Sequence, residues 1–183
     1  MNEVLDFWFG RSNSPEFGKV QKKWFEKDAD FDAEVRSRFM QQYELAASGQ
    51  LDSWQDSPEN CLALILLLDQ FPRNMFRGKA DSFASDEQAR AVATRALANG
   101  FDLKSDLPLR HFFYMPFEHS ESLSDQNRSV SLFTERVGKD HYTYPYALAH
   151  RAEIVRFGRF PSRNNALDRV STPEEQDFLR RKA

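Results

Sequence analysis

Two distant segments of the chain share one pattern, in which Phe-Pro is followed closely by an arginine and an asparagine. They are Phe71-Pro72-Arg73-Asn74 and Phe160-Pro161-Ser162-Arg163-Asn164. Proline lacks an N–H and disfavours the α conformation in the residue before it, so each pattern predicts a sharp helix end with an arginine and an asparagine just beyond it. Guanidinium donors form a rigid fork that suits carboxylates and phosphates. The paired patterns therefore predict an anion-binding site.

Other residues near predicted helix ends extend this site. The predicted ligand-binding residues are Arg73, Asn74, Arg77, Arg110, Tyr114, Arg159, Arg163 and Asn164. In the alternative interpretation these arginines pair with internal carboxylates, such as Asp69, Asp86 or Glu153, and cap helix carbonyls. They would then hold neighbouring helices together and bind nothing.

A second group of residues has the chemistry for proton transfer. The string Glu118-His119-Ser120-Glu121 is joined by His150 and Glu153, which lie three residues apart and share one helix face. Imidazole and carboxylate groups in an aromatic setting can act as acid and base. The candidate catalytic residues are His119, His150, Glu121 and Glu153. Alternatively, His150 forms a core hydrogen bond with Glu153 or with a nearby backbone group.

Several other chemistries are disfavoured by the sequence. Two histidines and a few carboxylates without a tight spacing rule do not match a zinc or di-iron site, so no metal is predicted. Ser120 lies outside any Gly-x-Ser-x-Gly elbow, and glycine-rich phosphate loops are missing. We therefore expect no cofactor.

The elements that must position these residues are predicted to be helices throughout. Apolar residues recur at helical spacing over residues 19–26 and 31–47, the latter ending before Gly49. Ser57 and Pro58 begin a very apolar helix that is predicted to end at Phe71. No segment alternates for long enough to predict a strand, so the fold class is all-α with antiparallel helix hairpins.

Later helices have clear predicted boundaries. Residues 85–88, Ser-Asp-Glu-Gln, match a capping box, and the helix they begin should stop at Asn99-Gly100. Residues 105–108 open a shorter helix that extends towards Met115-Pro116, and residues 122–125 cap another. A helix over residues 145–157 is bounded by proline and by Gly158. Thr172-Pro173 starts a polar terminal helix.

The bulk properties predict one cytoplasmic domain. The 183 residues are expected to form a single α-helical domain, with 165–183 as a peripheral segment, and 25 basic against 28 acidic residues give a net charge of -3. This charge provides no field for nucleic acid or for an anionic membrane, and neither a signal peptide nor a transmembrane segment is expected. The one cysteine, Cys61, is expected to be a small buried hydrophobe.

The N-terminal run Phe7-Trp8-Phe9 and two other aromatic groups are predicted to supply core volume. A single narrow helix face cannot bury three consecutive rings. Either the first helix is enclosed on several sides, or one ring is left for a partner.

Several motifs taken in order resemble the bacterial domain-of-unknown-function 924 family. They are residues 4–10 (VLDFWFG), 68–74 (LDQFPRN), 113–121 (FYMPFEHSE), and the stretch from His150-Arg151 to Arg163-Asn164. The resemblance implies a tetratricopeptide-like fold, in which antiparallel helix hairpins stack as a right-handed superhelix. It implies no established activity.

Three functions follow as hypotheses. In the first, a small anionic molecule or an acidic peptide terminus binds in a pocket lined by Arg73, Arg77, Arg110, His119, His150 and Arg163. In the second, an enzyme uses His119 or His150 with Glu121 or Glu153 for acid–base chemistry on an anionic substrate. In the third, the protein is a structural or protein-interaction scaffold.

Overall fold

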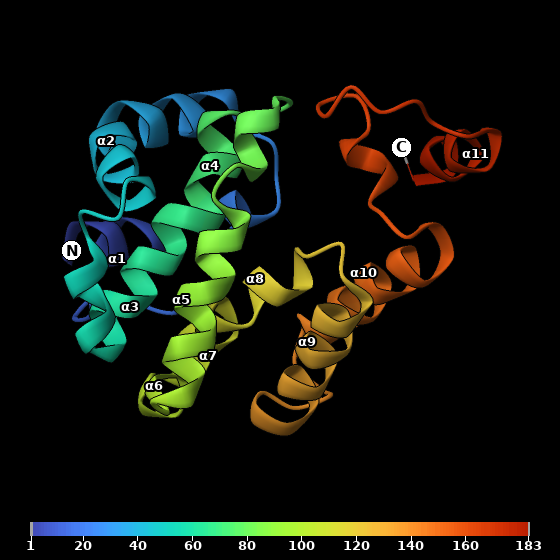
Figure 1. Cartoon of the computed structure of the whole chain (residues 1–183). Helices are drawn as coiled ribbons and strands as arrows, with labels where there is room; N and C mark the ends of the chain where they lie inside the picture. Colours follow the sequence, from blue (N-terminus) through green and yellow to red (C-terminus); the bar gives the residue numbers. More distant parts are fainter. Residues whose placement is uncertain (1, 183) are drawn as a thin grey trace. The chain divides into compact units, whose positions relative to one another are not determined.

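The computed structural model describes residues 2–182, which divide into two compact units (Figure 1). The first contains the residues up to Arg77 and Asp81–Pro116, and the second contains Gly78–Ala80 and the residues from Phe117 onwards. All regular elements in this part of the chain are helices or single helical turns, so the predicted all-α class is confirmed. None of these helices is both long and apolar enough to cross a lipid bilayer.

The first unit is built around a buried helical segment. Its helices are α1 (Asn2–Phe9), α2 (Ala29–Ala47), α3 (Pro58–Ile65), α4 (Phe71–Met75), α5 (Asp86–Ala98), α6 (Phe101–Lys104) and α7 (Leu107–Arg110), and α8 (Met115–Glu118) runs across the unit boundary. Helix α2 packs against α4, and α3 packs against α1 and α5. Every residue from Cys61 to Gln70 is buried, which makes this segment the centre of the core.

Cys61 is fully buried in α3, as predicted. Burial raises the pKa of its thiol to about 12, because the thiolate would lose its hydration.

Rings from several elements enclose α1. Trp8 and Phe9 are buried, and Phe7 stacks on Phe31 with ring centroids 5.4 Å apart. The cations of Lys23 and Arg38 lie over the remaining surface of the Phe7 ring, 4.9 and 4.6 Å from its centroid. Of the two predicted alternatives, enclosure on several sides is therefore the one observed.

The predicted helix stop at Phe71-Pro72 is wrong. The helical run continues from α3 through a π-helical turn at Leu66–Gln70 into α4, which ends at Met75. Proline in a continuing helix leaves the carbonyl four residues earlier without its donor. That carbonyl, on Leu68, accepts a hydrogen bond of 2.6 Å from the Ser85 hydroxyl. The wider π turn and Ser85 together allow the helix to pass through Pro72.

Two further local predictions need correction. Helix α5 starts and stops as predicted, but Ser85 makes no side-chain cap, because its hydroxyl bonds the Leu68 carbonyl. Residues 19–26 hold only a 3₁₀ turn at Lys22–Trp24 and no amphipathic helix. Likewise, the predicted helix from residue 105 towards Met115 is divided into α7, a 3₁₀ turn at His111–Phe113, and α8.

The second unit contains α9 (Leu123–Arg136), α10 (Tyr144–Phe157) and α11 (Pro173–Lys182), with a 3₁₀ turn at Pro161–Arg163. Helices α9 and α10 lie side by side (Figure 1), and α11 packs near the 3₁₀ turn. Helix α10 ends at Gly158, whose φ of 69° is left-handed, as predicted for a terminating glycine. A reciprocal capping box starts α11, where the backbone N–H of each of Thr172 and Glu175 donates to the other side chain.

Candidate functional site

Arg73 lies within α4, where two buried carboxylates surround it. Its two terminal nitrogens donate to the two oxygens of Asp86 at 2.9 and 3.0 Å. The carboxylate of Asp69, in the π turn, is 3.4 Å away, and the Asp69 carbonyl also accepts from Arg73. Arg73 therefore ties the central helix to the start of α5.

Asn74 and Arg77 share one partner on α2. The Asp32 carboxylate accepts from Asn74 at 2.8 Å and from two nitrogens of Arg77 at 2.5 and 2.7 Å. Burial raises the pKa of Asp32, but the hydrogen bonds from Arg77 and Asn74 outweigh that effect, and the pKa is lowered. These contacts fasten the end of α4 to α2.

Arg110 and Tyr114 both contact Asp102 in α6. The Arg110 guanidinium donates to the carbonyls of Asp102 and Ser105 at 3.0 and 3.2 Å, and so caps the C-terminal end of α6. The Tyr114 hydroxyl donates to the Asp102 carboxylate at 2.7 Å. The predicted ligand-binding residues of the first unit thus lie in three separate groups, each with partners inside the protein.

In the second unit, Arg159 and Asn164 meet at Glu175 of α11. Arg159 donates to both carboxylate oxygens at 2.7 and 2.8 Å, and the Asn164 amide donates at 3.2 Å. The hydrogen bond from Arg159 is the main cause that lowers the pKa of Glu175 to about 2. This ion pair joins the segment after α10 to α11.

Three other predicted site residues, His119, His150 and Arg163, lie close together in the second unit. His150 Nδ1 lies 2.5 Å from Glu118 Oε1. Glu118 is buried, whereas 30% of the His150 side chain is exposed. With Nδ1 donating to the carboxylate, Nε2 is the nitrogen that can accept or pass on a proton. Glu118 therefore fixes the orientation of the ring through Nδ1, and part of the His150 side chain remains exposed to solvent.

Three other side chains complete what we call the histidine cluster, defined as Glu118, His119, His150, Phe160 and Arg163. The rings of His119 and Phe160 lie 6.3 and 5.4 Å from the His150 ring, measured between centroids. Arg163 donates to the His119 carbonyl at 2.8 Å, and its guanidinium lies over the Phe160 ring. A carboxylate-oriented imidazole thus has a second imidazole and a guanidinium nearby.

The backbone that carries Glu118 and His119 is fixed by α9. The buried Gln126 amide donates to the carbonyls of Glu118 and Ser120 at 2.6 and 2.7 Å. Ser120 donates to Asp125 at 2.7 Å and accepts from the Ser122 N–H. Ser120 therefore has a structural role at the start of α9, consistent with its exclusion as a nucleophile.

Glu121 lies beside this cluster as an ion-pair partner. Its carboxylate accepts from Arg169 and from the Phe160 N–H, both at 2.9 Å. Burial raises the pKa of Glu121, but these two donors and the charges of Arg169 and Arg163 lower it overall. An ionised carboxylate held in this way positions the loop that carries Phe160.

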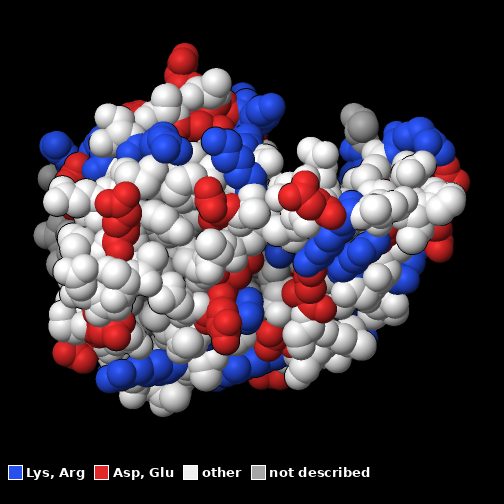
Figure 2. All heavy atoms as spheres, turned by 45° about the horizontal axis from the view of Figure 1, so that its top comes forward, with Lys and Arg blue, Asp and Glu red and all other residues white. Residues whose placement is uncertain are grey.

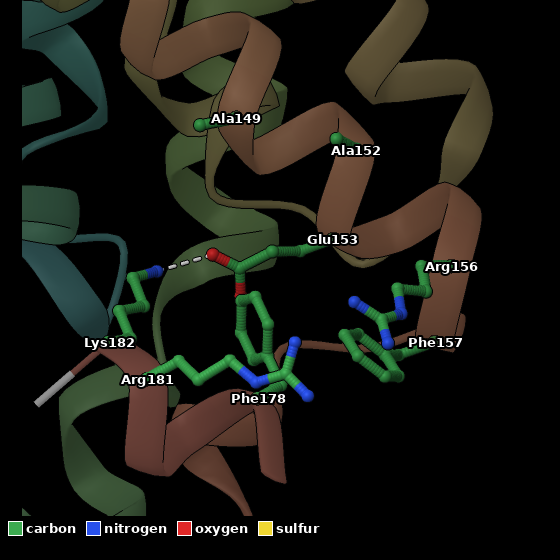
Figure 3. Close-up of a pocket in the computed structure, with 8 residues that line it drawn as sticks. All are labelled: Ala149, Ala152, Glu153, Arg156, Phe157, Phe178, Arg181 and Lys182. Atoms are coloured by element: carbon green, nitrogen blue, oxygen red, sulfur yellow. Dashed lines mark hydrogen bonds and ion pairs between the residues drawn. The ribbon is translucent and has the colours of Figure 1, made fainter. Parts of the chain in front are cut away.

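Glu153 does not pair with His150, although the two are three residues apart on α10. Its side chain turns towards α11, where Oε1 accepts from Lys182. It borders a cleft of about 530 Å³ between α10 and α11 (Figure 3). The predicted core pair between His150 and Glu153 is thus not formed, because each has a different partner.

In Figure 2 both positive and negative side chains are scattered over the visible surface, with uncharged residues between them. Within residues 2–182, no three histidine, cysteine, aspartate or glutamate side chains gather closely enough to hold a metal ion.

The predicted ligand-binding and catalytic residues do not include Glu118, Phe160 or Arg169, although Glu118 and Phe160 lie within the motifs that predict the site. Glu118 lies in the same short string as His119 and Glu121, but spacing alone does not tell which glutamate reaches His150. Arg169 lies outside every motif that was singled out. Only the path of the chain after α10 brings it to Glu121.

The family model and the solved structure that match this chain are both described as proteins of unknown function. A family model described as "Bacterial protein of unknown function (DUF924)" matches residues 4–183. A solved structure of a protein of unknown function from Agrobacterium tumefaciens is 41% identical, with a TM-score of 0.86, and the match covers 97% of this chain and 94% of that one. No curated protein matches.

Proposed function

This chain belongs to the bacterial DUF924 family, and from that premise we propose that its second unit binds a small anionic ligand at the histidine cluster. The observation that carries the proposal is the bond between Glu118 and His150, which orients a partly exposed imidazole, while Arg163 bonds the backbone of His119 in the same cluster. With Nε2 protonated, the oriented imidazole donates a directional hydrogen bond to a carboxylate or a phosphate, and a guanidinium supplies further donors. Suitable ligands are a small anion or an acidic peptide terminus.

The ligand-binding roles of the other predicted residues, Arg73, Asn74, Arg77, Arg110, Tyr114, Arg159 and Asn164, stay predictions. Their contacts support the alternative, structural role, because each has a partner within its own unit. We likewise retain the tetratricopeptide-like superhelix and the cytoplasmic location as proposals. The family resemblance supports the first, and a single buried cysteine supports the second.

A ligand screen by thermal shift tests the binding proposal. The probes are inorganic phosphate, succinate and the dipeptide Ala-Ala, each added to the wild type, His150→Gln and Arg163→Gln. A ligand at a hundred times its Kd stabilises the protein it binds by about 2.7 kcal/mol. We expect at least one probe to raise the Tm of the wild type and to have much less effect on both variants.

The matched control is His141→Gln, which changes a histidine of the same unit that contacts Thr143 and lies outside the histidine cluster. It should respond to the probe as the wild type does. Equal stabilisation of all four proteins, or of none, would contradict the proposal.

Acid–base catalysis is the second candidate, and the Glu118–His150 pair specifically favours it. A buried carboxylate behind an exposed imidazole fixes which ring nitrogen carries the proton, as general bases require. The catalytic roles then fall to His150 and His119. Glu121 holds the adjacent loop through Phe160, and the role predicted for Glu153 stays a prediction.

Proton uptake tests whether His150 changes its protonation state when a ligand binds, which an acid–base role requires. Titration calorimetry of a probe that binds, run in two buffers of different ionisation enthalpy, measures the protons exchanged on binding. We expect proton exchange in the wild type and none in His150→Gln. Identical exchange in both proteins would remove His150 from the acid–base role and leave binding intact.

A further inference from the structure

The cleft between α10 and α11 has an apolar wall. Phe157 and Phe178 pack against each other with centroids 5.1 Å apart, and Ala149 and Ala152 extend the wall along α10 (Figure 3). The cleft volume of about 530 Å³ falls within the usual range for small-molecule sites, roughly 300–1,000 Å³. Its lining therefore suits a ligand with a flat or compact apolar body.

Cations border this wall. Arg156 is committed to Glu174, with two hydrogen bonds of 2.8 and 2.7 Å, and lies over the Phe157 ring. Lys182 is paired with Glu153. Arg181 also lines the cleft and has no ion-pair or hydrogen-bond partner among the described residues (Figure 3). Its fork of donors is the group available to a ligand carboxylate.

One buried acceptor in the cleft is unsatisfied. Glu153 is 5% exposed, and its Oε2 has no hydrogen-bond partner within residues 2–182, whereas Oε1 accepts from Lys182. A buried polar atom without a partner destabilises the fold. A ligand hydroxyl or amino group in the cleft would supply the missing donor.

We propose that this cleft binds a small aromatic carboxylate that carries a hydroxyl or amino group. The ring packs against Phe178 and the alanines of α10, the carboxylate pairs with Arg181, and the donor reaches Glu153 Oε2. None of these residues belongs to the histidine cluster. The proposed site is therefore additional to the function proposed above.

Titration followed by amide NMR shifts tests the proposal with three related probes. They are 4-hydroxyphenylacetate, phenylacetate without the hydroxyl group, and 4-ethylphenol without the carboxylate. We expect 4-hydroxyphenylacetate to give saturable shifts over residues 149–157 and 178–182 and to bind most tightly. Arg181→Gln should weaken its binding about tenfold, as expected for the loss of one charge-assisted pair.

Arg180→Gln is the matched control, because Arg180 is also exposed on α11 but pairs with Asp177 outside the cleft. It should bind within about twofold of the wild type, a change that corresponds to well under 1.4 kcal/mol. Glu153→Met keeps an unbranched side chain of similar length and removes the acceptor, so the preference for the hydroxylated probe should disappear. His150→Gln should bind all three probes as the wild type does.

Three results would overturn the proposal. They are the absence of saturable shifts at ten millimolar probe, equal weakening by Arg180→Gln and Arg181→Gln, and a hydroxyl preference that persists in Glu153→Met. Because the histidine-cluster experiments use other residues and other probes, failure here leaves that function standing.

Discussion

The two Phe-Pro segments have similar sequences and different structures. At Phe71-Pro72 the helix continues, since the π turn and the Ser85 hydroxyl accommodate the proline. At Phe160-Pro161 the helix has already ended at Gly158, and a 3₁₀ turn follows. The fate of a helix at Phe-Pro thus depends on whether another element satisfies the freed carbonyl, and on whether a glycine precedes the proline.

The arginines that follow the two prolines, Arg73 and Arg163, also differ in their partners. Arg73 is held between two buried aspartates, whereas Arg163 donates to a backbone carbonyl beside His119. The first arginine is therefore part of the core, and the second is part of the histidine cluster. The changes below test this difference, starting with the largest expected effect.

Arg73→Met should destabilise the first unit most. It removes the cation between Asp69 and Asp86, and breaking a buried ion pair typically costs about 3–5 kcal/mol. All three tryptophans, Trp8, Trp24 and Trp54, lie in this unit, so urea unfolding followed by their fluorescence measures the loss.

The control for this change is Arg38→Met, which breaks exposed pairs with Glu3 and Glu34 and the cation contact with the Phe7 ring, and should cost about 1–2 kcal/mol. A loss in Arg73→Met no larger than in Arg38→Met would show that Arg73 is not a structural clamp.

Ser85→Ala should have the next largest effect. It leaves the buried Leu68 carbonyl without a partner, which costs about 1–3 kcal/mol. Adding Pro72→Ala restores a backbone N–H near that carbonyl, so the double variant should recover part of the loss in the same urea experiment. Strictly additive losses would argue against coupling between the proline and the serine.

These two residues also show what local sequence could not predict. The starts of α3 and α5 and the end of α10 were predicted, because proline, glycine and capping residues act within a few positions. The π turn was not, since the Ser85 hydroxyl that bonds its Leu68 carbonyl comes from another segment. For the same reason, the spacing of His150 and Glu153 suggested a pair, while the actual partner, Glu118, comes from α8.

In the second unit, the corresponding test is the removal of a helix cap and the measurement of the resulting loss of stability. Thr172→Ala removes the side-chain half of the capping box of α11, the bond that its hydroxyl accepts from the Glu175 N–H, and should cost about 1 kcal/mol, as typical N-caps do. Ser122 lies at the N-cap of α9 without a side-chain cap bond, so Ser122→Ala should cost clearly less. Amide hydrogen exchange of α11 and α9 measures both changes, and equal effects would contradict the assignment.

The last test is a change in the slope of stability with pH. Glu175 has a pKa of about 2 when folded, below its ordinary value of 4.5. A lowered pKa stabilises the fold above pH 4.5, and this stabilisation is lost as the pH falls towards 2. The free energy of unfolding of Glu175→Gln should therefore fall less steeply than that of the wild type over this interval. Parallel pH curves would show that Arg159 does not hold this carboxylate ionised.

Because Cys61 is buried, the rate at which its thiol is modified reports how often the first unit opens. Its thiol is sealed in α3, and its raised pKa keeps it protonated at neutral pH. A thiol reagent can therefore modify the chain only during moments when the central helix is released from its neighbours. As the chain has one cysteine, the rate of a mass increase in the intact protein counts those openings directly.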